Sequence, residues 1–205
     1  MSDTVPPLQQ KFPIPSADKF LSISCTVVGI GEGGGTSMLA RVAVVDYRGQ
    51  TVLSTYVQPS MPVWDYRTAT TGIEPEHLAP GNALEFNDVQ AQILNLIPGK
   101  ILVGHSIWND LSVLGVRHPA VATRDVALYQ PFRNALKTPK QVVGLRTLMW
   151  HLMRRRCQDG KQCALENARA AMDLYRSHAT EWEDVISKGQ WPSHLPPDTF
   201  ARCYL

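Results

Sequence analysis

Short apolar stretches alternate with polar turns along this chain, in a pattern typical of an α/β domain. The first half predicts three strands, over residues 19–28, 38–46 and 50–57, and the last two read as a hairpin. Gly29–Gly35 holds five glycines in seven residues, which predicts a turn. No Gly-Lys-Ser or Gly-Lys-Thr follows these glycines, so the turn is not a phosphate-binding loop.

The second half of the chain predicts helices that alternate with short buried strands. Apolar residues at three- and four-residue spacing predict a helix over 83–97, and Pro98-Gly99 ends it. The other expected elements are strand 100–104, helix 109–116, strand 123–126, helix 145–157 and a single helix over 163–187. This order predicts an α/β fold with a mixed central sheet, an antiparallel hairpin plus parallel strands, flanked by helices.

The 205 residues are enough for one main domain with a buried core. We expect a proline-rich N-terminal arm (1–18), the domain itself (19–188) and an irregular C-terminal segment (189–205). No apolar stretch is long enough to cross a bilayer, and the N-terminal region lacks the pattern of a secretory signal. The expected location is therefore intracellular, cytoplasmic or nuclear, with the four cysteines reduced and no zinc site.

The net charge of +2 says little, but its distribution is uneven. The segment 133–161 carries eight basic residues against Asp159 alone. One interpretation is a surface that binds nucleic-acid phosphates, and the other is a solvated helix face whose basic end favours the helix dipole. The candidates for nucleic-acid contact are Arg146, Arg154, Arg155 and Arg156.

Several short motifs occur in an order found in one known family. They are Val28-Gly29, Ala40-Arg41-Val42, Asp65-Tyr66-Arg67-Thr68, the run Gly104–Leu111, Arg124-Asp125, and Glu166 followed by 168–172. Together they resemble the DEDDh (DnaQ-like) 3′–5′ exonucleases, and most closely the RNA-exonuclease branch with its ribosomal-RNA-trimming and interferon-induced members. The resemblance implies the ribonuclease H-like exonuclease fold. It also implies two divalent ions held by four carboxylates, with a histidine general base.

The resemblance maps the family's catalytic machinery onto Ser24, Thr26, Asp110, Gln162 and Asn167, and only Asp110 has the family's residue. Ser24 and Thr26 replace the Asp-x-Glu of the first motif, Gln162 replaces the base, and Asn167 replaces the last Asp. Glutamine cannot take up a proton at neutral pH, and hydroxyl and amide groups are poor magnesium ligands. We therefore assign no catalytic residue and expect no resident cofactor, with at most weak binding of one Mg or Mn at Asp110.

Cys25, His105, Trp108, Asn109 and Glu166 are further candidates for contacts in the pocket. Cys25 and His105 could form a nucleophile and base, or only pack. Trp108 could stack on a flat ligand or close the core. Asp110 itself could bind an ion or stabilise the start of a helix.

The sequence leads to one main expectation and two alternatives. The main one is a catalytically degenerate pseudo-nuclease, not an active nuclease, that binds RNA, DNA or a protein partner through the retained cleft, with no membrane partner. The first alternative is a repurposed enzyme acting on a small-molecule ligand in the neutralised pocket. The second is a residual metal-dependent 3′–5′ exonuclease.

Overall fold

The computed structural model describes residues 13–205, so most of the expected N-terminal arm, residues 1–12, lies outside the described residues. A mixed sheet forms the middle layer, with strand order β3-β2-β1-β5-β6 and with β4 paired to β1. Its strands are β1 (Phe20–Ile30), β2 (Thr36–Asp46), β3 (Thr51–Tyr56), β4 (Val63–Asp65), β5 (Ile101–Gly104) and β6 (Thr123–Asp125). The β1-β2-β3 part is antiparallel and the β1-β5-β6 part is parallel, as expected.

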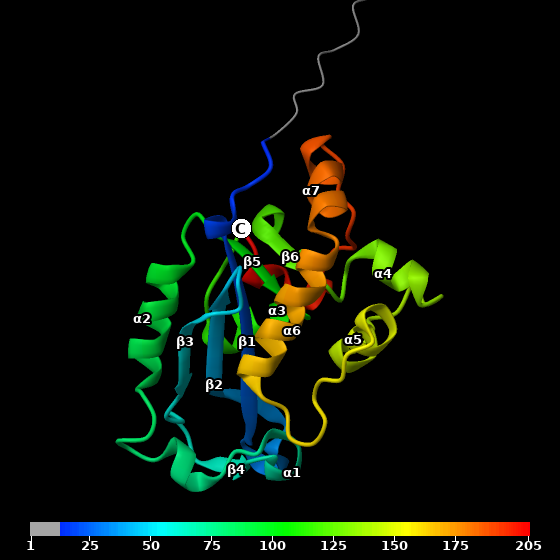
Figure 1. Ribbon diagram of the computed structural model, residues 1–205. Helices are drawn as coiled ribbons and strands as arrows, with labels where there is room; N and C mark the ends of the chain where they lie inside the picture. Colours follow the sequence, from blue (N-terminus) through cyan, green and yellow to red (C-terminus); the bar gives the residue numbers. More distant parts are fainter. Residues whose placement is uncertain (1–12) are drawn as a thin grey trace, which may run out of the picture.

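Helices cover both faces of this sheet (Figure 1). The α-helices are α1 (Thr68–Thr71), α2 (Phe86–Leu96), α3 (Ile107–Leu114), α4 (Gln130–Ala135), α5 (Leu145–Met153), α6 (Ala164–Ser177) and α7 (Ala179–Ser187). Short 3-10 helices span Ala17–Lys19, Glu32–Gly34, Pro75–Leu78, Ala120–Ala122 and Asp198–Cys203. No helix within residues 13–205 has the length and apolar character needed to cross a membrane.

The alternation of side chains along β1 creates the two halves of the core. Phe20 faces the helices α5, α6 and α7 and packs in a cluster with Met172. Leu21 and Ile23 face the opposite way, toward α2 and α3, and share a second cluster with Ile93. Because β1 is the central strand and helices cover both faces of the sheet, side chains in the second half of β1 lie between the sheet and its covering segments, where a cleft can form.

The structure differs from the expectation at the last long helix. Residues 163–187 form two helices rather than one, and the break falls at His178 (φ −132°, ψ 18°). The break turns α7 so that Trp182 stacks on Tyr129, with ring centroids 3.7 Å apart, and is completely buried. Burial of this indole in the core outweighs the continued helical periodicity of the sequence.

The C-terminal segment is also more ordered than expected. Residues 198–203 form a 3-10 helix, and Cys203 is buried in the cluster beneath α2 and α3. This part of the chain lies against α3 and so reaches the end of the sheet where the candidate site is found.

Candidate active-site cleft

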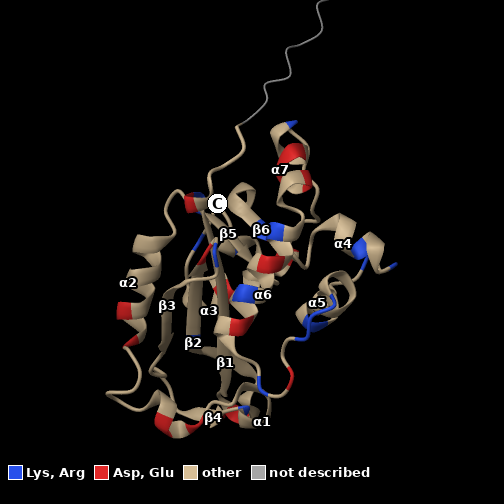
Figure 2. Ribbon diagram, in the orientation of Figure 1, with Lys and Arg blue, Asp and Glu red and all other residues tan. Residues whose placement is uncertain are grey.

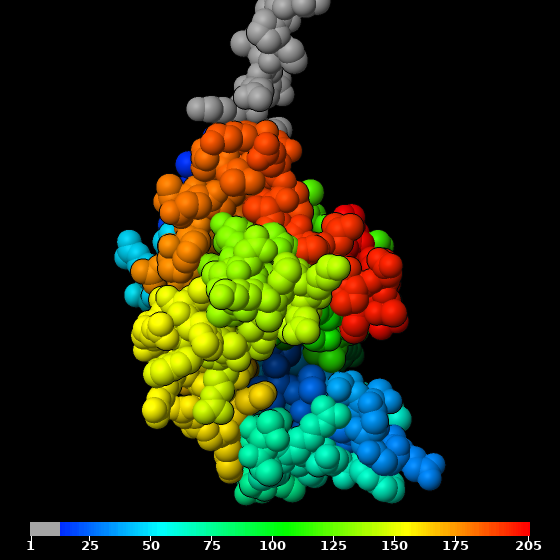
Figure 3. Space-filling model, turned by 90° about the vertical axis from the view of Figure 1, so that its right-hand side faces the viewer, coloured from blue at the N-terminus to red at the C-terminus, as the bar shows by residue number. Residues whose placement is uncertain are grey.

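Two neighbouring cavities, of about 500 and 710 Å³, meet at Cys25 and Val27 of β1. Figure 3 shows this hollow, with dark blue atoms of β1 at its floor and yellow and teal segments on its borders. We call the two cavities together the β1 cleft. A register shift between Thr26 and Val27 disturbs the pairing of β1 with β2 at this point. Such bulges re-aim side chains next to functional sites.

The first cavity joins β1 to the segment around α1. Thr26 and Gln162 line it together, although they lie far apart in the sequence. The backbone N–H of Gln162 donates to the carbonyl oxygen of Thr70 at 2.7 Å, which fixes the loop before α6 against α1. Two of the residues predicted from the resemblance therefore share one wall of the cleft.

The second cavity joins β1 to the start of α3. Asn109 and Asp110 line it, and Asp110 is only 8% exposed. Oδ1 of Asp110 accepts a hydrogen bond from the backbone N–H of Cys25 at 2.7 Å. This contact ties the first turn of α3 to the middle of β1 and places the carboxyl group at the cleft.

Asp125 explains why α3 begins where it does. Its carboxylate accepts backbone N–H groups from Ser106 at 2.9 Å, Ile107 at 2.7 Å and Ala127 at 2.9 Å. Ser106 takes the left-handed conformation (φ 58°) immediately before the helix. Asp125 thus caps α3, and its oxygens are committed to the backbone rather than to a ligand.

The pKa of Asp110 is raised to about 8, first by burial, with a smaller contribution from the nearby charge of Asp125, against the lowering effect of the Cys25 N–H. The ordinary value is 3.8, so between about pH 4 and pH 8 the folded protein keeps a proton that the unfolded chain has released. The contribution of Asp110 to stability is therefore full below about pH 4 and is lost as the pH rises through about 8.

Asp110→Asn should flatten the pH dependence of stability, because asparagine keeps the acceptor for Cys25 but does not titrate. Urea unfolding in EDTA between about pH 5 and pH 8 should give a free energy of unfolding that falls more steeply in the natural chain than in Asp110→Asn. The difference should approach about 1 kcal/mol per pH unit. Parallel pH profiles of the two proteins would show that Asp110 ionises freely in the fold.

The structure places other predicted residues away from the two cavities. Asn167 Oδ1 accepts from Gln158 Nε2 at 2.9 Å, and Glu166 Oε2 accepts from the Gln158 backbone N–H at 3.1 Å. Ser24 is half-buried within β1. These three are not among the residues that line the β1 cleft.

The remaining candidates have structural partners. Nε2 of His105 pairs with the carbonyl oxygen of Val143 at 2.7 Å, so the imidazole is held by a loop rather than by Cys25. Burial raises the pKa of the Cys25 thiol well above its usual range, which disfavours a nucleophilic thiolate. Trp108 is 5% exposed and packs near Phe200, consistent with closing the core rather than stacking on a ligand.

Two arginines in the cleft were not singled out from the sequence as site residues. Arg67 lines the first cavity, where its guanidinium donates to the Gly34 carbonyl oxygen at 3.1 Å. Arg202 lines the second cavity and donates to Ser112 Oγ at 3.3 Å. Arg67 belongs to the family motif Asp65-Tyr66-Arg67-Thr68, so the sequence could have indicated it. Nothing local in the sequence indicates Arg202, which only the tertiary fold brings to α3.

The four arginines predicted for nucleic-acid contact lie on α5 or just after it, where the ribbon in Figure 2 carries blue segments. None of them lines the two cavities. Arg146 and Arg156 line a separate pocket. Arg155 pairs with Asp173 at 2.5 Å, and Arg154 ends α5 in the left-handed conformation (φ 54°).

The ligand set of the cleft does not fit a two-cation centre. Among residues 13–205, no group of three or more His, Cys, Asp or Glu side chains is placed to hold a metal ion. Asp110 is the one carboxyl group in the lining of the second cavity, and Asp65 is the one in the lining of the first. Paired cations require several negatively charged oxygens, which these residues do not provide together.

Comparison with known proteins gives relatives in both sequence and structure. The chain is 41% identical over 178 residues to RNA exonuclease 4 of Kluyveromyces lactis, covering 85% of this chain and 58% of the relative. It is 39% identical over 178 residues to human RNA exonuclease 4, covering 87% of this chain and 41% of the relative. The chain thus spans about half the length of these curated relatives. No protein-family model matches it.

Solved structures of Pan2 share the fold. The catalytic unit of Neurospora crassa Pan2 superimposes with a TM-score of 0.68 at 21% identity, covering 92% of this chain and 32% of that one. The Saccharomyces cerevisiae Pan2 module in complex with A7 RNA superimposes with a TM-score of 0.70 at 24% identity, covering 85% of this chain and 31% of that one.

This chain has the ribonuclease H-like exonuclease fold, as predicted. The similarity to the RNA exonuclease 4 proteins further supports a DEDD-type RNA exonuclease family for the chain. The expectation of a catalytically degenerate protein that is not an active nuclease is wrong by this comparison, because relatives at 36–42% identity are named as RNA exonucleases. Replacement of the catalytic residues stays a prediction from the resemblance.

Proposed function

We propose that this chain is a 3′–5′ RNA exonuclease domain that takes the 3′ end of single-stranded RNA into the β1 cleft. The observation that carries the proposal is that each cavity of the cleft has an arginine in its lining, Arg67 in the first and Arg202 in the second, and that Asp110 lines the second cavity. Guanidinium groups bind phosphates through a planar fork of donors, so each cavity offers a contact for a phosphate of the strand.

The chain's own residues bind and orient the RNA end. Thr26 and Gln162 offer a hydroxyl and an amide to the sugar or phosphate oxygens in the first cavity. We propose at most one weakly bound Mg or Mn, shared between Asp110 and RNA phosphates, because magnesium often uses one or two carboxylates together with substrate phosphates. Such an ion would supply charge neutralisation at the phosphate. The modest ligand set implies slow turnover.

Removal of the Asp110 carboxyl group tests this proposal. Single-stranded RNA labelled at its 5′ end, incubated with Mn or Mg, should shorten one nucleotide at a time from the 3′ end. Asp110→Asn should lower the rate by at least about tenfold. Asp88→Asn, an exposed residue on α2, is the matched control and should leave the rate unchanged. No shortening by the natural chain, or equal rates for Asp110→Asn and Asp88→Asn, would contradict the proposal.

A further inference from the structure

A basic and aromatic surface stands apart from the cleft, on the outer face of α5. Leu145, Leu148 and Met149 turn inward to the core, which leaves the opposite side of the helix in solvent. Arg146 and Trp150 are four residues apart on α5 and both exposed, so their side chains lie on the same outer face of the helix. We call Arg146, Thr147, Trp150, His151 and Arg156 the α5 patch; with Asp159 they line a pocket of about 390 Å³.

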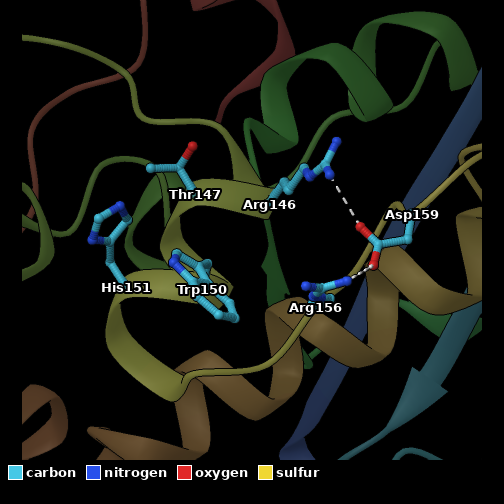
Figure 4. A pocket seen from close by; sticks show the side chains of 6 residues that line it. All are labelled: Arg146, Thr147, Trp150, His151, Arg156 and Asp159. Atoms are coloured by element: carbon cyan, nitrogen blue, oxygen red, sulfur yellow. Dashed lines mark hydrogen bonds and ion pairs between the residues drawn. The ribbon is translucent and has the colours of Figure 1, made fainter.

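Figure 4 shows how these side chains lie around the pocket. The indole of Trp150 is 44% exposed, and the guanidinium carbon of Arg156 lies 5.9 Å from its ring centroid. Asp159 pairs with Arg146 at 3.1 Å and with Arg156 at 3.9 Å. The side chains of Arg146 and Arg156 are 66% and 77% exposed, so both can reach a ligand.

We propose that the α5 patch is a second binding subsite for single-stranded RNA, with Trp150 as a stacking platform for a base and the two arginines as phosphate contacts. The inference rests on the proposed function, because the strand that it binds is the one whose 3′ end enters the β1 cleft. An exposed indole next to guanidinium groups matches a base and its phosphates, since every base has a flat face and every linkage a negative charge. The surrounding segment 133–161, with its single acidic residue, adds to the attraction.

The chain itself connects the α5 patch to the cleft. The segment that leaves α5 carries Arg156 and then reaches Lys161, which lies against Gly72, and Gln162, which lines the first cavity. In Figure 3 the yellow surface of this region forms one border of the hollow above β1. The α5 patch and the first cavity therefore lie at the two ends of one short segment, residues 154–162, which offers a path for a strand that leaves the cleft on this side.

Asp159 gives the proposal a gain-of-binding test. Its carboxylate accepts a hydrogen bond from Arg146 at 3.1 Å, lies 3.9 Å from the guanidinium of Arg156, and repels an incoming phosphate. Asp159→Asn removes that competition, so RNA affinity should rise severalfold. A surface with no role in RNA binding would show no change on this substitution.

Fluorescence anisotropy with two labelled RNAs separates the α5 patch from the cleft. An RNA of about 12 nucleotides can span both, whereas one of about 4 nucleotides fills the cleft alone. Trp150→Ala should weaken binding of the long RNA by about 5- to 150-fold and leave the short RNA unaffected. Arg146→Gln should also lower the salt dependence of binding, by about 0.7 in the logarithmic slope. EDTA in all samples prevents degradation.

Matched controls come from other parts of the chain. Trp191→Ala removes another exposed indole beside an arginine, and Arg48→Gln removes an exposed arginine in the turn before β3; neither should change RNA binding. Unchanged binding of the long RNA by both Trp150→Ala and Arg146→Gln would overturn the inference, while RNA shortening in the nuclease assay would still support the proposed function. Equal loss with long and short RNA, or preference for double-stranded over single-stranded RNA, would also overturn it.

Discussion

Four substitutions that restore the family's residues at the positions given by the resemblance, Ser24→Asp, Thr26→Glu, Gln162→His and Asn167→Asp, are expected to raise the rate of RNA shortening by at least about 10²-fold. The resemblance implies that the three new carboxylates would join Asp110 as ligands for paired cations, although Ser24 and Asn167 do not line the two cavities. The imidazole would add a base on the cleft wall, where Gln162 now stands. A positioned base alone contributes about 10²–10⁴-fold.

Comparison with the triple variant that keeps Gln162 isolates the contribution of the base. The variant with all four substitutions should shorten RNA faster than the triple variant, by the factor of about 10²–10⁴ expected for a general base. Gln162→Asn, introduced in place of Gln162→His, should give no such gain in rate. Rates are measured in Mn, because the added carboxylates repel one another and destabilise the fold without metal. Equal rates for the natural chain and the fourfold variant would show that these positions do not form the reactive site.

Removal of Glu183 is expected to cause the largest loss of stability, about 3–5 kcal/mol in the free energy of unfolding. Both oxygens of Glu183 accept from the guanidinium of Arg124, at 2.6 and 2.8 Å, and both side chains are 3% exposed. Tyr175 donates a further hydrogen bond to this carboxylate at 2.9 Å. Glu183→Ala leaves the Arg124 charge buried without a partner, in the contact between β6 and α7.

Asp184, the next residue along α7, provides the matched control. It pairs with Lys188 on the surface, where the two side chains are 50% and 46% exposed. Exposed pairs contribute about 0–1 kcal/mol, so Asp184→Ala should have little effect in urea unfolding. If Glu183→Ala is no more destabilised than Asp184→Ala, the buried ion pair does not hold α7 to the sheet.

Much of the fold follows from local sequence patterns. The apolar runs of β1 and β2 and the apolar periodicity of α2 place these elements within a few residues of their observed bounds. The break at His178 could not be predicted, because the helical spacing continues through it and only the packing of Trp182 on Tyr129 decides it. The short elements β4 and α1 have too few residues to show a period, and contacts with β1 define β4.

The site was predictable only where a motif carried it. Asp110 lines the second cavity of the β1 cleft, and Thr26 and Gln162 line the first, while their catalytic assignment stays a prediction from the resemblance. Arg202 lies 90 residues beyond its partner Ser112, and nothing in its local sequence indicates a role in the cleft. The functional expectation was wrong because it gave more weight to the residues expected to be replaced than to the overall similarity to named RNA exonucleases.

Digestion of one RNA sequence in linear and in circular form tests the central claim most directly. The proposed 3′–5′ exonuclease needs a free 3′ end, so the linear RNA should shorten in single-nucleotide steps while the circle persists. Cleavage of the circle at a similar rate, or persistence of both forms in Mg and in Mn, would contradict the account.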